Sequence, residues 1–285
     1  MFVILLKAIY FIFTFIILIL ISIAYPRVTQ NPKLPKNTGF FLFSFYYITS
    51  IIILVYVFDF SLFFAIMIKV FYLISAQFLG LKLRIIGLSG QICSGKTTAA
   101  EFFRHKYNAV IIDYKEILIS VLRKPDVRVN IRKDFGDQLF KNIKNLEYDE
   151  EQFKKFINSN KVNQIGHIIN KYIIQDILLR ILQEKIYFNT KHVFLENAFL
   201  LRSSFLKYLC FPILSICSDI GYAPIIRRAM NKYKCDRDEA TEVYLSNQST
   251  LLEYKYLSDY VILNNGTIDH FIEQLDKFMK NDLKI

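Results

Sequence analysis

Eight consecutive residues carry the clearest chemistry in this sequence. Gly90-Gln-Ile-Cys-Ser-Gly95-Lys96-Thr97 fits the phosphate-binding pattern G-x-x-x-x-G-K-[ST]. The two glycines let the backbone curl so that its N–H groups point at phosphate oxygens. Lys96 then supplies an ammonium group to the β- and γ-phosphates, and the Thr97 hydroxyl is placed to ligate Mg²⁺. We expect ATP and Mg²⁺ to bind here, through Gly90, Gln91, Ile92, Cys93, Ser94, Gly95, Lys96, Thr97 and Thr98. A glycine-rich turn without a ligand is the alternative.

The segments around this loop predict an α/β domain. Five short runs have the length and the Val and Ile content of buried parallel strands: LRIIGL, AVIID, HVFLE, ILSIC and YVIL. Longer, charged helical segments separate them, which favours a doubly wound parallel sheet. We therefore expect residues 81–285 to form a P-loop NTPase-type sheet flanked by helices, with a helical acceptor-binding region and a lid.

Residues 1–80 have a different composition and predict a membrane anchor. They contain one acidic residue, Asp59, and the hydrophobic fraction of the whole chain is 53%. Residues 2–25 are long enough to cross a bilayer, 26–38 form a polar loop, and about 39–80 are apolar for twice the length of one crossing. We expect a transmembrane helix over about 2–25 and an apolar hairpin over about 39–80 that turns near Asp59. A cleaved signal peptide is the alternative for the first helix.

The basic residues of the loop at 26–38 predict the orientation in the membrane. Short loops rich in Lys and Arg stay on the cytosolic side, and a hairpin returns the chain to that side. The sequence thus indicates an integral membrane protein whose domain at 81–285 faces the cytosol. In the alternative, one crossing is followed by an interfacial helix around Lys69.

Charge and cysteines exclude other classes of function. The net charge of +11 is accompanied by no RNA-binding signature or zinc-finger spacing, so we expect no nucleic acid partner. Cys93, Cys210, Cys217 and Cys235 include no C-x-x-C pair and no neighbouring His at metal-ligand spacing. A disulfide framework and a zinc site are therefore not expected.

Over about residues 83–275 the order of motifs resembles the dephospho-CoA kinase family, which phosphorylates the ribose 3′-hydroxyl of dephospho-CoA. The opening I-I-G-L-S-G is similar to V-G-L-T-G of the family, and Ile111-Ile112-Asp113 matches V-I-D-x-D. The resemblance implies that Asp113 accepts the proton of the attacking hydroxyl, as a carboxylate beside the γ-phosphate is suited to do. A helix N-cap is the alternative role for Asp113.

Further motifs extend the resemblance into the middle of the chain. Arg132-Lys-Asp-Phe-Gly136-Asp-Gln-Leu139-Phe140 looks like R-x-x-L-G-x-x-V-F, which implies that Arg132 contacts phosphate or the acceptor. His167 and Lys171 fall where the family has H-P-x-[IV]-[RK] in its helical acceptor-binding region. The segment from Phe194 to Leu201 resembles V-x-D-x-P-L-L-F, so that Glu196 would support Mg²⁺ through water.

The C-terminal third resembles the lid and the adenine-binding strand of the family. A basic stretch from Arg227 to Arg237 corresponds to the lid, in which Arg228 and Lys232 are expected to reach the triphosphate. A solvated basic helix is the alternative. Asn264-Asn265-Gly266-Thr267 resembles N-x-G, which implies that Asn264 and Gly266 help to hold the adenine.

Five residues depart from the family pattern: Gln91 for Gly, Lys115 for Asp, Ala198 for Pro, Arg202 for Glu and Lys232 for Arg. They leave two alternatives to a membrane-anchored dephospho-CoA kinase. One is another P-loop kinase of nucleotides or small molecules. The other is a catalytically weak nucleotide-binding membrane protein. The first reading remains our expectation, with ATP and dephospho-CoA as substrates.

Overall fold

A computed structural model describes residues 2–29, 38–56, 61–142, 146–149, 152, 165–203, 205–246 and 251–283. The chain divides into two compact units. The first contains Met1–Ile85 together with Ser204–Phe211, and the second contains Ile86–Ser203 and Pro212–Ile285. The first unit thus takes up a short segment from far along the chain, which the division expected at residue 81 did not include.

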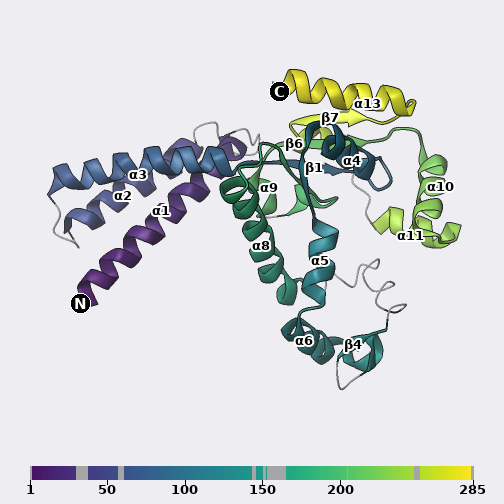
Figure 1. The fold of residues 1–285 in the computed structure, drawn as a ribbon, viewed down its shortest axis with the longest axis horizontal. Helices are drawn as coiled ribbons and strands as arrows, with labels where there is room; N and C mark the ends of the chain where they lie inside the picture. Colours follow the sequence, from purple (N-terminus) through teal and green to yellow (C-terminus); the bar gives the residue numbers. More distant parts are fainter. Residues whose placement is uncertain are drawn as a thin grey trace. The chain divides into compact units, whose positions relative to one another are not determined.

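The first unit is built from long apolar helices. They are α1 (Phe2–Thr29), α2 (Thr38–Tyr56) and α3 (Leu62–Leu83), joined by the short α9 (Leu206–Leu209). Helix α1 packs along both α2 and α3 (Figure 1), and it also contacts α9. Two hydrogen bonds tie α1 to α2, because Tyr10 donates to the Ser50 carbonyl oxygen at 2.9 Å and Tyr46 donates to that of Thr14 at 3.0 Å. The expected turn at Asp59 lies outside the described residues.

Among the described residues of this unit, the charged side chain of Lys69 lies inside. Lys69 on α3 is fully buried, and its Nζ has no hydrogen-bond partner. The ammonium instead lies 5.5 Å from the ring centroid of Tyr10 and 6.0 Å from that of Tyr72, which is the geometry of cation–π attraction. Lys69 therefore faces the interior of the helical unit, where the π-faces of two rings replace water.

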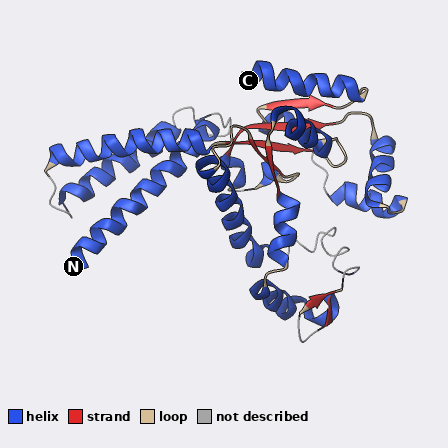
Figure 2. Cartoon of the chain, in the orientation of Figure 1, coloured by secondary structure: helices blue, strands red, loops and turns tan. Residues whose placement is uncertain are grey.

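The second unit has the parallel sheet that the sequence predicts. Its strands are β1 (Ile85–Gly90), β2 (Val110–Asp113), β5 (Val193–Glu196), β6 (Cys210–Cys217) and β7 (Tyr260–Leu263). Their order is β2-β5-β1-β6-β7, and the pairings of β5 with β1 and β2 and of β6 with β7 are parallel. Figure 2 shows these strands among helices. The α/β prediction is confirmed, although β1 begins two residues later than expected because α3 continues to Leu83.

Helices cover the sheet because its strands carry apolar side chains on both faces. The first helix after the loop, α4 (Lys96–Tyr107), and the last helix, α13 (Ile268–Lys277), form one core with the strands. Phe103 of α4 stacks on Phe194 of β5 at 4.6 Å between ring centroids. Strand residues of the other parity, such as Leu195 and Ile213, are buried as well, since alternate side chains point to opposite faces.

The remaining elements connect the strands or follow the last helix. The helical part after β2 contains α5 (Tyr114–Leu122), α6 (Pro125–Phe135), η1 (Gly136–Leu139), the antiparallel pair β3 (Phe140–Asn142) and β4 (Glu147–Tyr148), α8 (Gly166–Leu182) and η3 (Gln183–Tyr187). Later come η4 (Leu200–Arg202), α10 (Tyr222–Tyr233), α11 (Arg237–Ser246), α12 (Leu251–Leu257) and η5 (Phe278–Asp282).

Candidate active site

The loop between β1 and α4 has a backbone that only glycine permits at its two ends. Gly90 has φ +138°, and a Cβ added there would lie 1.9 Å from the Ile216 carbonyl oxygen. Gly95 has φ +105°, and a Cβ there would lie 2.6 Å from Asn264 Nδ2. Both glycines are therefore required by positive φ and by close packing. Gly95 is also the N-cap of α4 and carries no side chain that would cap its first turn, where an anion is favoured.

Lys96 turns its ammonium back onto the loop. Its Nζ donates to the carbonyl oxygens of Gly90 at 3.0 Å and Gln91 at 2.5 Å. Desolvation lowers the pKa of this ammonium to about 8, Lys232 acts in the same direction, and Glu196 opposes the shift. A group held by carbonyl dipoles at this position can exchange them for the oxygens of a triphosphate.

Two carboxylates meet at the ends of adjacent strands. Asp113 is the last residue of β2 and pairs in register with Glu196, the last residue of β5. Burial raises the pKa of Glu196, and the charge of Asp113 adds to this shift, whereas Lys96 and Lys232 oppose it. The edge of the sheet next to the loop therefore concentrates negative charge opposite two ammonium groups.

Asp113 is also a helix N-cap, the alternative role that the sequence offered for it. Its Oδ1 accepts a hydrogen bond from the Lys115 backbone N–H at 2.7 Å, which makes it the N-cap of α5. This bond holds the carboxylate at the strand end. The cap and a role in proton transfer are compatible, because a carboxylate has a second oxygen.

The other loop residues divide between buried and exposed positions. Ser94 is buried, and its hydroxyl donates to the Gln91 carbonyl oxygen at 2.8 Å. Thr97 and Thr98 are exposed on the first turn of α4, and Ile92 is half-buried. Thr97 is thus accessible to a ligand at the helix N-terminus.

Cys93 joins the loop to the lid. It packs against a cluster formed by α10 and α11 around Ile226, Ala229 and Ala240. Burial raises the pKa of its thiol, although Lys232, Lys96 and Arg228 act to lower it. Arg228 and Lys232 therefore lie near enough to the loop to act on the thiol of Cys93, and their contact with a triphosphate remains a prediction.

Asn264 lies against the phosphate loop. Its Nδ2 donates to the Ser94 carbonyl oxygen at 2.9 Å, and its backbone N–H donates to the Cys217 carbonyl oxygen at 2.8 Å. Gly266 is exposed two residues further on, in the turn before α13. The structure thus connects the predicted adenine-binding segment directly to the loop.

Arg132 is not brought to this site. It lies on α6, where its Nε donates to Asp137 Oδ1 at 2.6 Å. Figure 1 shows α6 at the end of α5 that is remote from the sheet. His167 lies on α8, and its Nε2 is 3.4 Å from Oδ2 of Asp134, which lies on α6 like Arg132. These residues belong to the helical part of the domain, and their contact with an acceptor remains a prediction.

Sequence reasoning missed the side chain of Gln91 and the residues that follow β6. Gln91 Oε1 accepts from the Ser218 backbone N–H at 2.8 Å, and Asn265 Oδ1 accepts from that of Asp219 at 2.7 Å. The available signal was the polar pair Ser218-Asp219 directly after the strand ILSIC, since residues at this edge of a parallel sheet face the ligand crevice.

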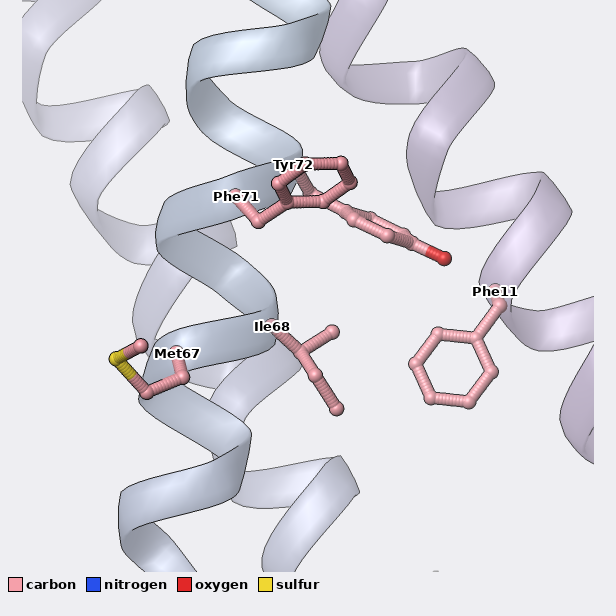
Figure 3. A pocket seen from close by; sticks show the side chains of 5 residues that line it. All are labelled: Phe11, Met67, Ile68, Phe71 and Tyr72. Atoms are coloured by element: carbon pink, nitrogen blue, oxygen red, sulfur yellow. The ribbon is translucent and has the colours of Figure 1, made fainter.

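An apolar pocket of ≈ 480 Å³ lies in the first unit and contains none of this chemistry. It is lined by Phe11 of α1 and by Met67, Ile68, Phe71 and Tyr72 of α3. Figure 3 shows Phe11 facing Ile68 and Tyr72 across it. The phosphate-binding loop and its carboxylates, which lie in the second unit, are therefore the candidate active site.

Known proteins share the sequence and the fold of the second unit. The family model described as dephospho-CoA kinase matches residues 84–270. The chain is 27% identical over 200 residues to the dephospho-CoA kinase of Fusobacterium nucleatum, which covers 70% of this chain and 98% of that protein. It is also 27% identical over 213 residues to an uncharacterized protein of Caenorhabditis elegans, covering 71% and 87%.

Solved structures agree on the fold. TT1252 from Thermus thermophilus superposes with a TM-score of 0.55 at 19% identity, covering 70% of this chain and 96% of that one. The loop, the two strand ends and the lid of this chain all fall within residues 84–270, which are more than half of its length. The chain therefore belongs to the dephospho-CoA kinase family.

Proposed function

We propose that the loop between β1 and α4 holds the triphosphate of ATP and that Asp113 activates the 3′-hydroxyl of dephospho-CoA in the kinase reaction of this family. The observation that carries this proposal is the position of Lys96. Its ammonium rests on two loop carbonyl oxygens and interacts with Glu196, which is paired in register with Asp113. The groups for binding and for proton transfer thus meet at one edge of the sheet.

Binding of ATP replaces hydrogen bonds that Lys96 makes within the loop. The phosphate oxygens take the Lys96 ammonium from the carbonyls of Gly90 and Gln91, and the first turn of α4 adds its N–H groups. The ammonium is not left without acceptors in this exchange, because phosphate oxygens replace the carbonyl oxygens. The proposal puts the γ-phosphate on the side of Asp113 and Glu196, because Glu196 interacts with Lys96.

In the transfer step the 3′-oxygen forms a bond to the γ-phosphorus while the bond from that phosphorus to the β–γ bridging oxygen breaks. ADP leaves, and the hydroxyl proton passes to Asp113. Lys96 and the lid residues Arg228 and Lys232 offset the negative charge on the transferring group. The cap on Oδ1 orients the Asp113 carboxylate for this task.

The residues present fit Mg²⁺. The Thr97 hydroxyl and the Glu196 carboxylate are oxygen donors of the kind that Mg²⁺ prefers, and a cation would relieve the repulsion between Glu196 and Asp113. In the described part of the chain no group of three or more His, Cys, Asp or Glu side chains could hold a metal ion. Bound beside Thr97 and Glu196, Mg²⁺ would neutralise charge on the β- and γ-phosphates.

The proposal includes a membrane tether at the N-terminus. Among the described residues, Phe63–Leu83 is one helix long and apolar enough to cross a bilayer, and Ile9–Ala24 and Ser44–Tyr56 are shorter apolar helices. Large apolar side chains are exposed along α1 and α3, among them Phe13 and Phe71, as expected for lipid-facing positions. Lys69, in contrast, points inward, which is where charged side chains of membrane helices lie. The basic loop at 26–38 favours a kinase domain on the cytosolic side.

Substitution of Asp113 by Asn tests the catalytic role. Asn caps helices about as well as Asp, so α5 should remain intact. We expect kcat for CoA formation to fall by about 10²- to 10⁴-fold while the affinity for ATP stays within about twofold. The measurement is steady-state CoA formation by the full chain, with calorimetric binding of ATP beside it.

The same substitution at Asp126 is the matched control, because Asp126 is an exposed carboxylate in the first turn of α6. If Asp113→Asn and Asp126→Asn leave kcat equally high, Asp113 is only a helix cap and the proposed role is wrong.

A further inference from the structure

We propose that Gln91 is a positioning residue for ATP, which acts by closing a ring of hydrogen bonds with Ser94, Ser218 and Asn264. We name these four residues the Gln91 ring. The proposal rests on the proposed function, because it concerns how the same loop is held ready for a triphosphate. It adds a role to a side chain for which the phosphate-binding pattern specifies no residue type.

The ring is continuous through four hydrogen bonds. The Ser218 backbone N–H donates to Gln91 Oε1 at 2.8 Å, and the Ser218 hydroxyl donates to the Asn264 carbonyl oxygen at 3.2 Å. Asn264 Nδ2 donates to the Ser94 carbonyl oxygen at 2.9 Å. The Ser94 hydroxyl returns to the Gln91 carbonyl oxygen at 2.8 Å. The loop is thereby joined to the ends of β6 and β7, which precede Ser218 and Asn264.

The backbone supports the same arrangement. Gln91 N–H donates to the Ile216 carbonyl oxygen at 3.1 Å, and the Asn264 N–H donates to that of Cys217 at 2.8 Å. The ring therefore closes around strands that already lie in register. Substitution of a side chain can therefore remove a hydrogen bond of the ring and leave the backbone pairing of the sheet intact.

The ring holds the atoms that bind Lys96. The Gln91 carbonyl oxygen accepts from both the Ser94 hydroxyl and the Lys96 ammonium. A fixed Gln91 carbonyl group also fixes the position of the Lys96 ammonium and the direction of the neighbouring backbone N–H groups. Preorganisation of this kind strengthens binding because less freedom is lost when the ligand arrives.

Gln91 is a feature of this chain, because the family pattern has Gly at this position. A glycine has no side chain to reach Ser218. Gln91 is also absent from the residues with positive φ, so its backbone does not demand glycine. The Gln91 side chain thus adds a second link from the loop to the end of β6, beside the backbone bond to Ile216.

The test is Gln91→Met, which keeps the length of the side chain and removes its hydrogen-bonding groups. Loss of one hydrogen bond predicts a KM for ATP raised about 3- to 10-fold, with the KM for dephospho-CoA and kcat within about twofold. The dissociation constant of ADP, measured by calorimetry on the full chain, should rise by the same factor. Gln175→Met, on the exposed surface of α8, is the matched control and should change none of these values.

A double substitution tests the ring itself. If Gln91 and Asn264 act through one ring, Gln91→Met combined with Asn264→Ala should raise the ADP dissociation constant little more than the more harmful single change does. Two additive effects would overturn the ring. An unchanged ADP affinity in Gln91→Met, or an equal rise in the KM of both substrates, would overturn the positioning role.

The nucleotide readout separates this proposal from the proposed function. Should the wild-type chain bind ADP but transfer no phosphate to dephospho-CoA, the proposed function fails and the ADP affinities still decide on the ring. A wild-type chain that binds no nucleotide would overturn both.

Discussion

At the scale of single residues, Lys96 is the group whose charge decides whether the loop binds its ligand. Its ammonium rests on two carbonyl oxygens, and desolvation lowers its pKa to about 8. A triphosphate brings negative charge to the ammonium, so its pKa in the complex must be higher than in the free protein. Binding and protonation of Lys96 are therefore linked.

This linkage predicts a pH dependence of ATP binding. Below about pH 8 Lys96 is already charged and the affinity is at its full value. As the pH rises above about 8, binding must take up a proton, and the affinity falls by up to about tenfold per pH unit. Calorimetry from pH 7 to 9.5 in buffers of different ionisation enthalpy measures both the affinity and the proton uptake. Lys96→Met should bind weakly with no inflection near pH 8, and an inflection that survives this substitution would assign it to another group.

The site residues differ in how far sequence could predict them. The pattern around Gly90, Gly95 and Lys96 predicts the backbone of the loop. A loop that binds phosphate needs glycine at the two positions where φ is positive and the packing is close. The link between Gln91 and Ser218 could not be predicted, since it joins residues 127 positions apart and depends on the order of β1 and β6 in the sheet. The phosphate-binding residues are neighbours in the sequence, whereas the hydrogen bonds that hold them come from distant residues.

At the scale of elements, α10 and α11, the proposed lid, share an apolar cluster with Cys93 of the loop. The basic residues of α10 are therefore held near the triphosphate site by packing. Lys232 is exposed, yet its charge acts on the pKa values of Cys93, Lys96 and Glu196. The lid that contacts phosphate therefore remains our proposal, with a solvated basic helix as the alternative.

The lid predicts different effects for neighbouring lysines. Lys232→Met should lower kcat/KM for ATP on the order of 10- to 100-fold, because one charge near the transferring phosphate is lost. Lys232→Arg should keep or raise this value, since a guanidinium binds phosphate in a bidentate manner. Lys234→Met, which removes an equally exposed charge one residue beyond α10, is the control. Equal losses in Lys232→Met and Lys234→Met would indicate only a general effect of net charge.

Strands were more predictable than helices at this scale. The Val- and Ile-rich runs ending at Asp113 and Glu196 are strands, because buried parallel strands need continuous apolar sequence. The distance of Arg132 from the loop was not predictable, because its motif gives spacing along the chain and says nothing of the direction in which α5 leads α6 away from the sheet.

At the scale of the whole molecule, the chain combines an apolar helical unit with a kinase unit, and each has its own interior. In the first unit the buried side chains include Lys69 and apolar residues such as Leu18 and Leu54, whereas Phe13, Phe71 and other large apolar side chains are exposed. This apolar surface differs from that of a water-soluble helical bundle, which carries polar side chains on its outer face. Composition alone indicated an anchor, but it did not indicate that residues 204–211 join the same unit.

The membrane tether predicts how the full chain fractionates. In cell membranes treated with alkaline carbonate, the protein should remain in the pellet, because the proposed tether places its apolar helices in the hydrocarbon layer. A tag after Ile285 should be digested by protease added to sealed vesicles that expose their cytosolic face. Release of the chain by carbonate would contradict the tether, and a protected tag would contradict the orientation.

The central claim is that this loop passes the γ-phosphate of ATP to dephospho-CoA. The most direct measurement supplies the purified full chain in detergent with Mg²⁺, ATP labelled in the γ-phosphate, and equal amounts of dephospho-CoA and AMP, and then separates the products. The account predicts label in CoA, little in ADP formed from AMP, and none in either with Lys96→Met. Labelled ADP without labelled CoA, or CoA labelled equally well by Lys96→Met, would contradict it.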